Sequence, residues 1–148
     1  MLQIDVSAVR FNSWYRWSLR PRPSQEFDVP VNFGILGLYV LGTGEDKPGA
    51  GLAPSGSDLP ADIVYIGSSA HVDRRLERWH DAVARYKREF GDDRCSRLWI
   101  SIWYSDWTNS WEGTGRGVVA QTRLLAYERA LIHAYAVQNG RLPALNRE

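Results

Sequence analysis

The stretch ILGLYVLG (residues 35–42) and, after a Gly- and Pro-rich interval, the stretch IVYIG (residues 63–67) decide the expected fold. Each is a short run of apolar and aromatic residues, and the first is bounded by Gly34 and Gly42, which is typical of a buried strand. We therefore predict a strand over Ile35–Leu41 and a second strand over Ile63–Ile66. The second strand closes an antiparallel hairpin with the first.

The interval between these strands, residues 42–60, contains five Gly and three Pro and almost no large apolar residue. A loop of this length is unusual within a compact domain, and such loops are either functional or disordered. The composition favours a long flexible loop.

After the second strand the apolar period changes to that of a helix. Apolar residues recur at helical spacing at Val72, Leu76, Trp79, Val83 and Phe90. This pattern predicts an amphipathic helix over 71–90 that ends at Gly91.

A third strand and a second helix complete the expected domain. Leu98–Tyr104 is rich in aromatic and β-branched residues, which favours a strand. A long helix is expected from Val118 to Asn139, with Gly140 just past its end. A polar loop over 105–117 joins the two. The predicted fold is α/β (α+β), with a small three-stranded antiparallel sheet flanked by helices.

Length and composition limit the class of protein. A chain of 148 residues is the usual size of one domain. The net charge is +1, so DNA binding cannot be argued from overall charge. Cys95 is the only cysteine, which excludes an intrachain disulfide and a Cys-based zinc site. There is no secretory leader pattern and no apolar stretch near the ~20 residues of a membrane span, so we expect a soluble, cytoplasmic protein.

Residues 1–33 are expected to form an arm that packs on a domain over residues 34–148. Basic and aromatic residues alternate in this arm, at Arg10, Trp14, Tyr15, Arg16, Trp17, Arg20 and Arg22. Two interpretations stay open, because Arg with aromatic residues suits both. The arm either caps the core with its Trp side chains or contacts nucleic acid.

Glu128 is the most informative single residue of the second long helix. On a helical wheel it falls inside an apolar arc made by Leu124, Leu125, Leu131, Ile132 and Tyr135. A carboxylate there is costly to desolvate unless it is paired or binds a metal. Arg75 borders the apolar stripe of the first helix, and its guanidinium can pair with Glu128 or bind a phosphate. The three His residues show no metal-ligand spacing, so no His-based metal site is predicted.

These residues, taken in order, resemble the motifs of the GIY-YIG nuclease superfamily. Gly37-Leu38-Tyr39 matches the first motif, Tyr65-Ile66-Gly67 the second, and Arg75 the helix arginine. Glu128 matches the metal-binding glutamate, and Pro143–Asn146 resembles the closing Pro-x-x-Asn segment. The match covers Gly34 to Asn146. The family fold is a three-stranded antiparallel sheet flanked by helices.

The resemblance implies hydrolysis of DNA phosphodiester bonds with one divalent metal ion. Glu128 would bind Mg²⁺ or Mn²⁺, and Arg75 would bind the scissile phosphate. Tyr39 would be the general base on the attacking water, with Tyr65 positioning that water. A free phenol has a pKa near 10, so this role requires a nearby cation, either Arg75 or the metal. Asn146 would brace the site.

The same resemblance implies further contacts and partners. Gly67, Ser68 and Arg74 are expected to contact the substrate. DNA is the expected partner, and the protein is expected to act as a monomer or a transient dimer without a membrane.

Two features of the sequence differ from the family pattern. The tyrosine motifs are usually about ten residues apart, whereas the 42–60 interval separates them here. Many members also carry His four residues after the helix arginine, where this chain has Trp79. His80 follows one residue later, and one helical step is about 100°, so His80 is expected to point away from the site unless the helix is distorted.

Two alternatives to an active nuclease follow. The chain can be an inactive module of this fold that binds DNA or a protein partner, or a structural domain with a buried Arg75–Glu128 pair.

Overall fold

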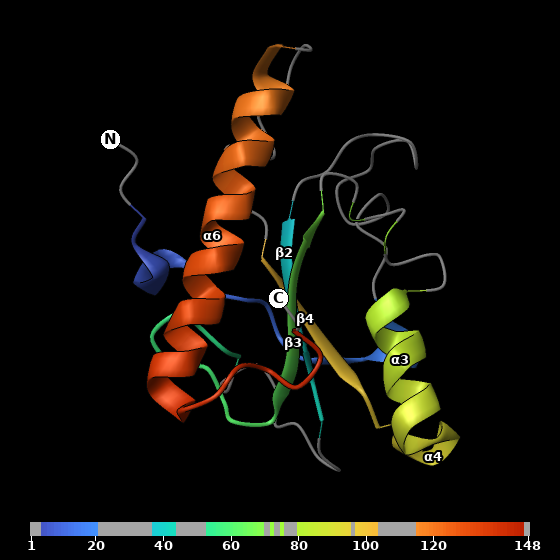
Figure 1. The fold of residues 1–148 in the computed structure, drawn as a ribbon. Coiled ribbons are helices and arrows are strands. Elements are labelled where there is room, and N and C mark those ends of the chain that lie inside the picture. Colours follow the sequence, from blue (N-terminus) through green and yellow to red (C-terminus); the bar gives the residue numbers. More distant parts are fainter. Residues whose placement is uncertain are drawn as a thin grey trace.

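The computed structural model describes residues 4–20, 37–43, 53–69, 72, 75, 80–95, 97–103 and 115–146. The elements are the 3₁₀ helices η1 (Val6–Ala8) and η2 (Trp17–Leu19), the strands β1 (Tyr15–Arg16), β2 (Gly37–Gly42), β3 (Ile63–Ser69) and β4 (Trp99–Trp103), and the helices α3 (Asp81–Phe90), α4 (Asp92–Cys95) and α6 (Gly115–Asn139). The strands form an antiparallel sheet in the order β1-β4-β2-β3. Helix α6 lies on one face of this sheet and α3 on the other, so the fold is α+β (Figure 1).

The predicted hairpin is confirmed as the antiparallel pair β2 and β3. Tyr39 lies opposite Gly67, and Leu41 lies opposite Tyr65. Alternation along β2 directs Leu38 toward the α6 face and Tyr39 toward the α3 face. β2 is fully buried because it has a strand on each side and a helix over each face.

The prediction of three strands is wrong, because the sheet has a fourth strand, β1, which the N-terminal arm contributes. Tyr15 pairs with Ile100 of β4. Asn12 extends this pairing, since its backbone N–H donates to Ile102 O and its side-chain oxygen accepts from Ile102 N. A two-residue strand is too short to show an alternating pattern, so no sequence pattern predicted it.

The described part of the arm is built into the core. Val9, Phe11 and Trp14 are buried and pack with the residues under α6. These three side chains of the arm thus pack on the core, and DNA contact by the arm stays a prediction.

The second half of the expected long loop, residues 53–60, is packed. Leu59 is only 3% exposed, and its backbone N–H donates to the side chain of Gln138 on α6. Gly56 donates to Val9 O, and a Cβ on Gly56 would lie 1.8 Å from Val6 O, so only glycine fits there. Residues 44–52 of the loop lie outside the described residues.

The prediction of one continuous helix over 71–90 is wrong at His80. Val72 and Arg75 have helical backbone, but His80 is extended (φ −85°, ψ 128°) and caps the N-terminus of α3. Its Nδ1 accepts a hydrogen bond from Ala82 N at 3.1 Å. An N-cap residue has non-helical dihedrals by definition, so the helical phase is not continuous through this position. The predicted end is confirmed, because Gly91 is the C-cap with φ 88°.

The predicted second long helix is confirmed as α6, and Gly140 follows it with φ 75°. Its packed face differs from the expected arc. Leu124, Leu131 and Tyr135 are buried, whereas Leu125 is 52% exposed. Glu128 therefore lies at the edge of the packed face, partly buried, rather than in its middle.

The C-terminal segment covers the outer edge of β3. It returns from the end of α6 to the sheet (Figure 1), where Leu145 N donates to Val64 O. No helix in the described part of the chain is long and apolar enough to cross a membrane.

Candidate active site

The two motif tyrosines meet on the α3 face of the sheet, packed over one glycine. Their ring centroids are 6.0 Å apart. A Cβ built on Gly67 would lie 2.6 Å from Tyr65 Cε2 and 2.8 Å from Tyr39 Cζ. The absence of a side chain at Gly67 therefore provides the space that both rings occupy. Tyr39 is fully buried, whereas Tyr65 is partly buried and lines a cavity.

His80 enters this cluster, because the helix on which it was expected to point away does not continue through it. Its Nε2 lies 2.5 Å from Tyr39 Oη, and its ring is edge-on to those of Tyr39 and Tyr65, at 5.3 and 5.6 Å between centroids. Because α3 begins only after His80, the side chain of His80 does not follow the direction that one continuous helix would give it. One weak sequence signal existed: Asp81 directly after His80 is typical of a helix first turn.

Burial and neighbouring cations keep His80 uncharged. The side chain is 2% exposed, and burial is the main reason that its pKa is lowered from 6.5 to about 4. Arg75, Arg85 and Arg20 lower it further, and Asp81 opposes them. At neutral pH the imidazole is therefore neutral.

Arg75, whose own backbone is helical, approaches the same phenol oxygen. Its Nε donates to Tyr39 Oη at 3.5 Å, and this bond raises the pKa of Arg75. The structure describes both Arg75 and Glu128, and no ion pair joins them. This contradicts a structural role based on an Arg75–Glu128 pair.

The phenol of Tyr39 is harder to ionise than the sequence suggested. Burial raises its pKa above the ordinary value of 10, and the neighbouring Tyr65 and Glu128 add to this effect. The hydrogen bond and the charge of Arg75 oppose it but do not outweigh burial. The protein without a bound cation therefore holds Tyr39 as a neutral phenol.

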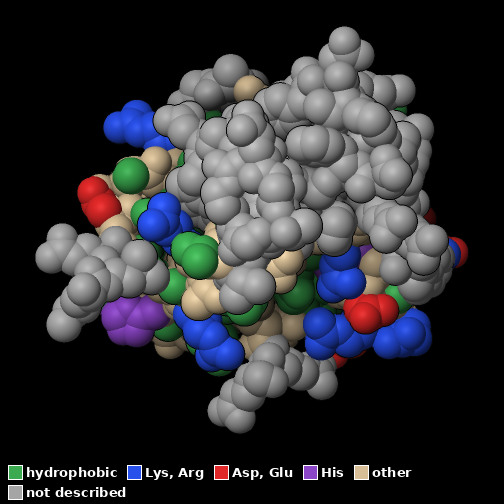
Figure 2. Space-filling model, turned by 90° about the horizontal axis from the view of Figure 1, so that it is seen from above, with side chains coloured by type: hydrophobic (Ala, Val, Ile, Leu, Met, Phe, Trp, Pro, Cys, Tyr) green, Lys and Arg blue, Asp and Glu red, His purple; other side chains and the backbone are tan. Residues whose placement is uncertain are grey.

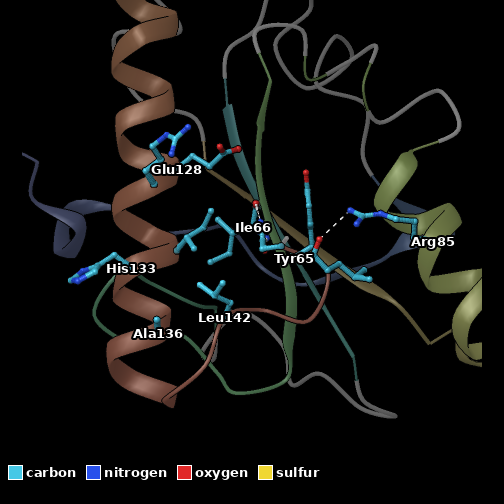
Figure 3. Close-up of a pocket in the computed structure, with 11 residues that line it drawn as sticks. Tyr65, Ile66, Arg85, Glu128, His133, Ala136 and Leu142 are labelled. Carbon is cyan, nitrogen blue, oxygen red and sulfur yellow. Dashed lines mark hydrogen bonds between the residues drawn. The ribbon is translucent and has the colours of Figure 1, made fainter. Parts of the chain in front are cut away.

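Glu128 reaches from α6 toward the end of β3. Its Oε1 accepts a hydrogen bond from Ser68 Oγ at 2.9 Å. Glu128 and Tyr65 both line a cavity of about 530 Å³ between α6, β3 and the C-terminal segment, and Figure 3 shows the Glu128 side chain directed from the helix toward the strand. Exposed Arg129 lines the same cavity one residue further along α6.

Asn146 holds the second tyrosine motif from outside the sheet. Its Oδ1 accepts from Ile66 N and its Nδ2 donates to Ile66 O, both at 2.8 Å. Ile66 is the residue between Tyr65 and Gly67. Asn146 thus fixes the backbone that carries the tyrosine and the glycine, without touching the phenol groups.

Two side chains of the N-terminal arm, Trp17 and Arg20, lie beside the cluster on the His80 side, which the sequence did not predict. The Trp17 ring lies edge-on to His80 with 6.0 Å between centroids, and the Arg20 guanidinium lies 4.1 Å over the Trp17 ring. Arg20 also donates to Trp17 O. The alternation of Arg and Trp in the arm was the visible signal, but it did not say which element these residues would meet.

The predicted site residues separate into two neighbouring groups. Tyr39, Tyr65, Gly67 and Arg75 lie together around the phenol oxygen, with His80 added. Glu128 lines the cavity and accepts a hydrogen bond from Ser68, and Asn146 bonds to the backbone of Ile66 in β3. Arg74 lies outside the described residues.

Glu128 and Ser68 present oxygen atoms, the kind of donor that Mg²⁺ prefers. Mg²⁺ commonly takes one or two protein carboxylates and completes its shell with water and substrate phosphate. No group of three or more His, Cys, Asp or Glu gathers among the residues that the structure describes, so the protein would supply one carboxylate from this set.

Comparisons with protein-family models, with curated proteins and with solved structures found no match to this chain.

Proposed function

We propose that the tyrosine cluster and Glu128 form the active site of a metal-dependent endonuclease that hydrolyses DNA phosphodiester bonds, the class that the sequence motifs resemble. The observation that carries this proposal is the packing of Tyr39 and Tyr65 on Gly67, with Arg75 bonded to the Tyr39 oxygen. A domain that used these residues only for packing would not need a guanidinium at a buried phenol.

Each residue has a chemical role in the proposed reaction. Arg75 binds the scissile phosphate and stabilises the charge that develops on it. Tyr39, as phenolate, takes a proton from water while the water oxygen bonds to phosphorus and the bond to the leaving oxygen breaks. Tyr65, which reaches the cavity, positions that water.

Glu128 would hold Mg²⁺ or Mn²⁺, with Ser68 fixing the orientation of the carboxylate. When bound, the cation supplies positive charge at the phosphate and the leaving oxygen. Because Arg75 alone leaves the pKa of Tyr39 raised, the proposal needs this second cation to favour the phenolate.

DNA contact in this proposal is local rather than spread over a basic face. In the view of Figure 2 the described Lys and Arg side chains form separate spots among apolar and polar ones. This agrees with the net charge of +1. We place the phosphate contacts at Arg75 and at Arg129 beside the cavity, with Gly67 and Ser68 at the end of β3.

The second candidate is a module that binds DNA or a protein without cleaving. The complete burial of Tyr39 and its raised pKa favour this alternative. A general base has to meet the water that it deprotonates, which requires the cluster to open toward the cavity.

Incubation with supercoiled plasmid, with and without Mg²⁺ or Mn²⁺, separates the two candidates. The nuclease proposal predicts metal-dependent nicking that disappears in Glu128→Ala and Tyr39→Phe. If the wild-type protein shifts DNA in gels in a salt-dependent way but never cuts it, the binding module is the correct function.

A further inference from the structure

We propose that His80 is a fixed N–H donor to the Tyr39 oxygen, a positioning residue rather than the base that deprotonates Tyr39. The tautomer follows from the geometry of the helix start. The kinetic consequence rests on the proposed nuclease function.

The N-terminus of α3 fixes which nitrogen of His80 carries the proton. Ala82 N donates to His80 Nδ1 at 3.1 Å, and a backbone N–H can only donate, so Nδ1 presents its lone pair. A neutral imidazole has one N–H, which must then be on Nε2. Nε2 lies 2.5 Å from Tyr39 Oη, so Nε2–H donates to the phenol oxygen.

The surroundings of His80 oppose a second proton on the ring. A proton on Nδ1 would face the Ala82 N–H and break the helix cap. The positive charges of Arg75, Arg85 and Arg20 act against a second proton, and Asp81 is the acidic neighbour that opposes them. Among the described residues, the rings of Tyr39, Tyr65 and Trp17 contact the imidazole edge-on.

This arrangement determines the direction of the Tyr39 proton. The phenol oxygen accepts from His80 Nε2–H and from Arg75 Nε–H. Its own proton therefore points away from both donors. When that proton leaves to solvent, the phenolate oxygen already has two N–H donors in place, which is the preorganised arrangement that stabilises a developing anion.

His80 cannot accept the phenol proton, because Nε2 is already protonated. In the proposed reaction the phenolate takes one proton from the attacking water and becomes a phenol again. The proton count of His80 is unchanged throughout.

Two substitutions separate the donor role from the helix-cap role. His80→Asn keeps an N-cap acceptor for Ala82 N but is too short to reach Tyr39. His80→Gln is long enough to donate an amide N–H to Tyr39 but is a poorer cap.

We expect His80→Asn to fold and to lower kcat on the order of tenfold to a hundredfold with little change in KM. His80→Gln should retain most of the kcat at a lower Tm. The opposite result, an active His80→Asn and an inactive but folded His80→Gln, would overturn the donor role.

The tautomer itself can be measured without DNA cleavage. In full-length protein labelled with ¹⁵N-histidine, long-range ¹H–¹⁵N spectra at pH 7 should show His80 with a protonated Nε2 and an unprotonated Nδ1, and His80→Asn identifies the signal by its loss. The slowly exchanging Nε2 proton should shift upfield in Tyr39→Phe. An Nδ1–H tautomer or an imidazolium overturns the inference even if the protein cuts DNA. If the wild-type protein cuts no DNA but shows the Nε2–H tautomer, the fixed donor stands and the nuclease proposal fails.

Discussion

At the scale of one residue, the packing of two tyrosine rings over Gly67 explains why Tyr65 is followed two positions later by glycine. The pairing of β2 with β3 sets Tyr39 opposite Gly67, and Tyr65 lies on the same strand as the glycine. Both rings then converge on the space above its Cα. The sequence predicted that these residues lie in one hairpin. Only the packing explains why the position after Ile66 has to be glycine.

Gly67→Ala should disturb the site more than the fold. The added methyl would contact both tyrosine rings below 3.0 Å, so the rings must move or the strands must separate. We expect a loss of about 1–3 kcal/mol in the free energy of unfolding, together with loss of DNA cleavage. Chemical denaturation and plasmid nicking measure the two effects. Gly91→Ala, which strains a positive φ at the far end of α3, is the matched control. It should lose stability and keep activity, and equal activity losses in both variants would contradict the proposed packing role.

The two tyrosines can be assigned their roles by comparing Tyr39→Phe with Tyr65→Phe. Each substitution removes one hydroxyl and keeps the ring. The hydroxyl of Tyr39 accepts hydrogen bonds from Arg75 and His80. We therefore expect its loss to lower kcat about 10²–10⁴-fold, which is the range for loss of a general base. Tyr65→Phe should lower kcat less. A larger effect for Tyr65→Phe, measured under single turnover, would reverse the two roles.

At the scale of elements, the interruption of the helix at His80 matters most for the site. Hydrophobic periodicity is insensitive to such an interruption, because Val72 and Val83 are buried on the same side before and after it. His80 lies one position after the place where the family carries its His. Because the helix is interrupted there, His80 contacts Tyr39 directly. Asn146, which the resemblance implies braces the site, bonds to the backbone of Ile66, a partner that the sequence did not indicate.

The buried neutral His80 should make the protein less stable in mild acid. The folded pKa is about 4 and the ordinary value is 6.5, so between these pH values the unfolded chain binds a proton that the folded protein does not. The free energy of unfolding therefore falls as pH decreases from 6.5 to 4, by a total on the order of 3 kcal/mol from this residue. Urea titrations at several pH values should show a steeper fall for wild type than for His80→Asn. Parallel curves would contradict a buried neutral imidazole.

Asn146→Ala should free the outer edge of β3. Two hydrogen bonds to Ile66 are lost, one of them to a backbone N–H, and we expect about 1–3 kcal/mol of destabilisation. Hydrogen exchange should show faster exchange of the Ile66 amide than in wild type, while amides of β4 change little. Unchanged exchange at Ile66 would mean that another group protects this edge.

At the scale of the whole molecule, the sequence predicted the hairpin, the third strand and the long C-terminal helix, because each has a strong apolar pattern. It did not predict β1 or the packed segment 53–60, because both depend on contacts between residues far apart in the chain. Phe11, for example, donates to Pro54 O, and no local pattern in either segment indicates this. The residues around Tyr39 show the same limit: Trp17 and His80 reach this cluster through tertiary contacts that no local pattern indicates.

The arm should be essential for folding. Deletion of residues 1–20 removes β1 and the buried Val9, Phe11 and Trp14, which exposes the α6 side of the core. We expect the deleted chain to lose its cooperative thermal transition. Arg16→Ala, which removes a guanidinium 4.7 Å from the Trp99 ring, should keep that transition, with a loss of at most about 1 kcal/mol. A cooperatively folded deletion variant would mean that the arm is an accessory segment.

The rate of plasmid nicking as a function of Mg²⁺ concentration, compared between wild type and Glu128→Gln, tests the proposed nuclease site most directly. Gln keeps the acceptor for Ser68 Oγ and removes only the negative charge. We expect a saturable, Mg²⁺-dependent rate for wild type and for the control Glu89→Gln on the exposed side of α3, and a rate at least about a hundredfold lower for Glu128→Gln. Equal rates for wild type and Glu128→Gln, or cleavage that persists in a chelator, would contradict a metal-dependent site at Glu128.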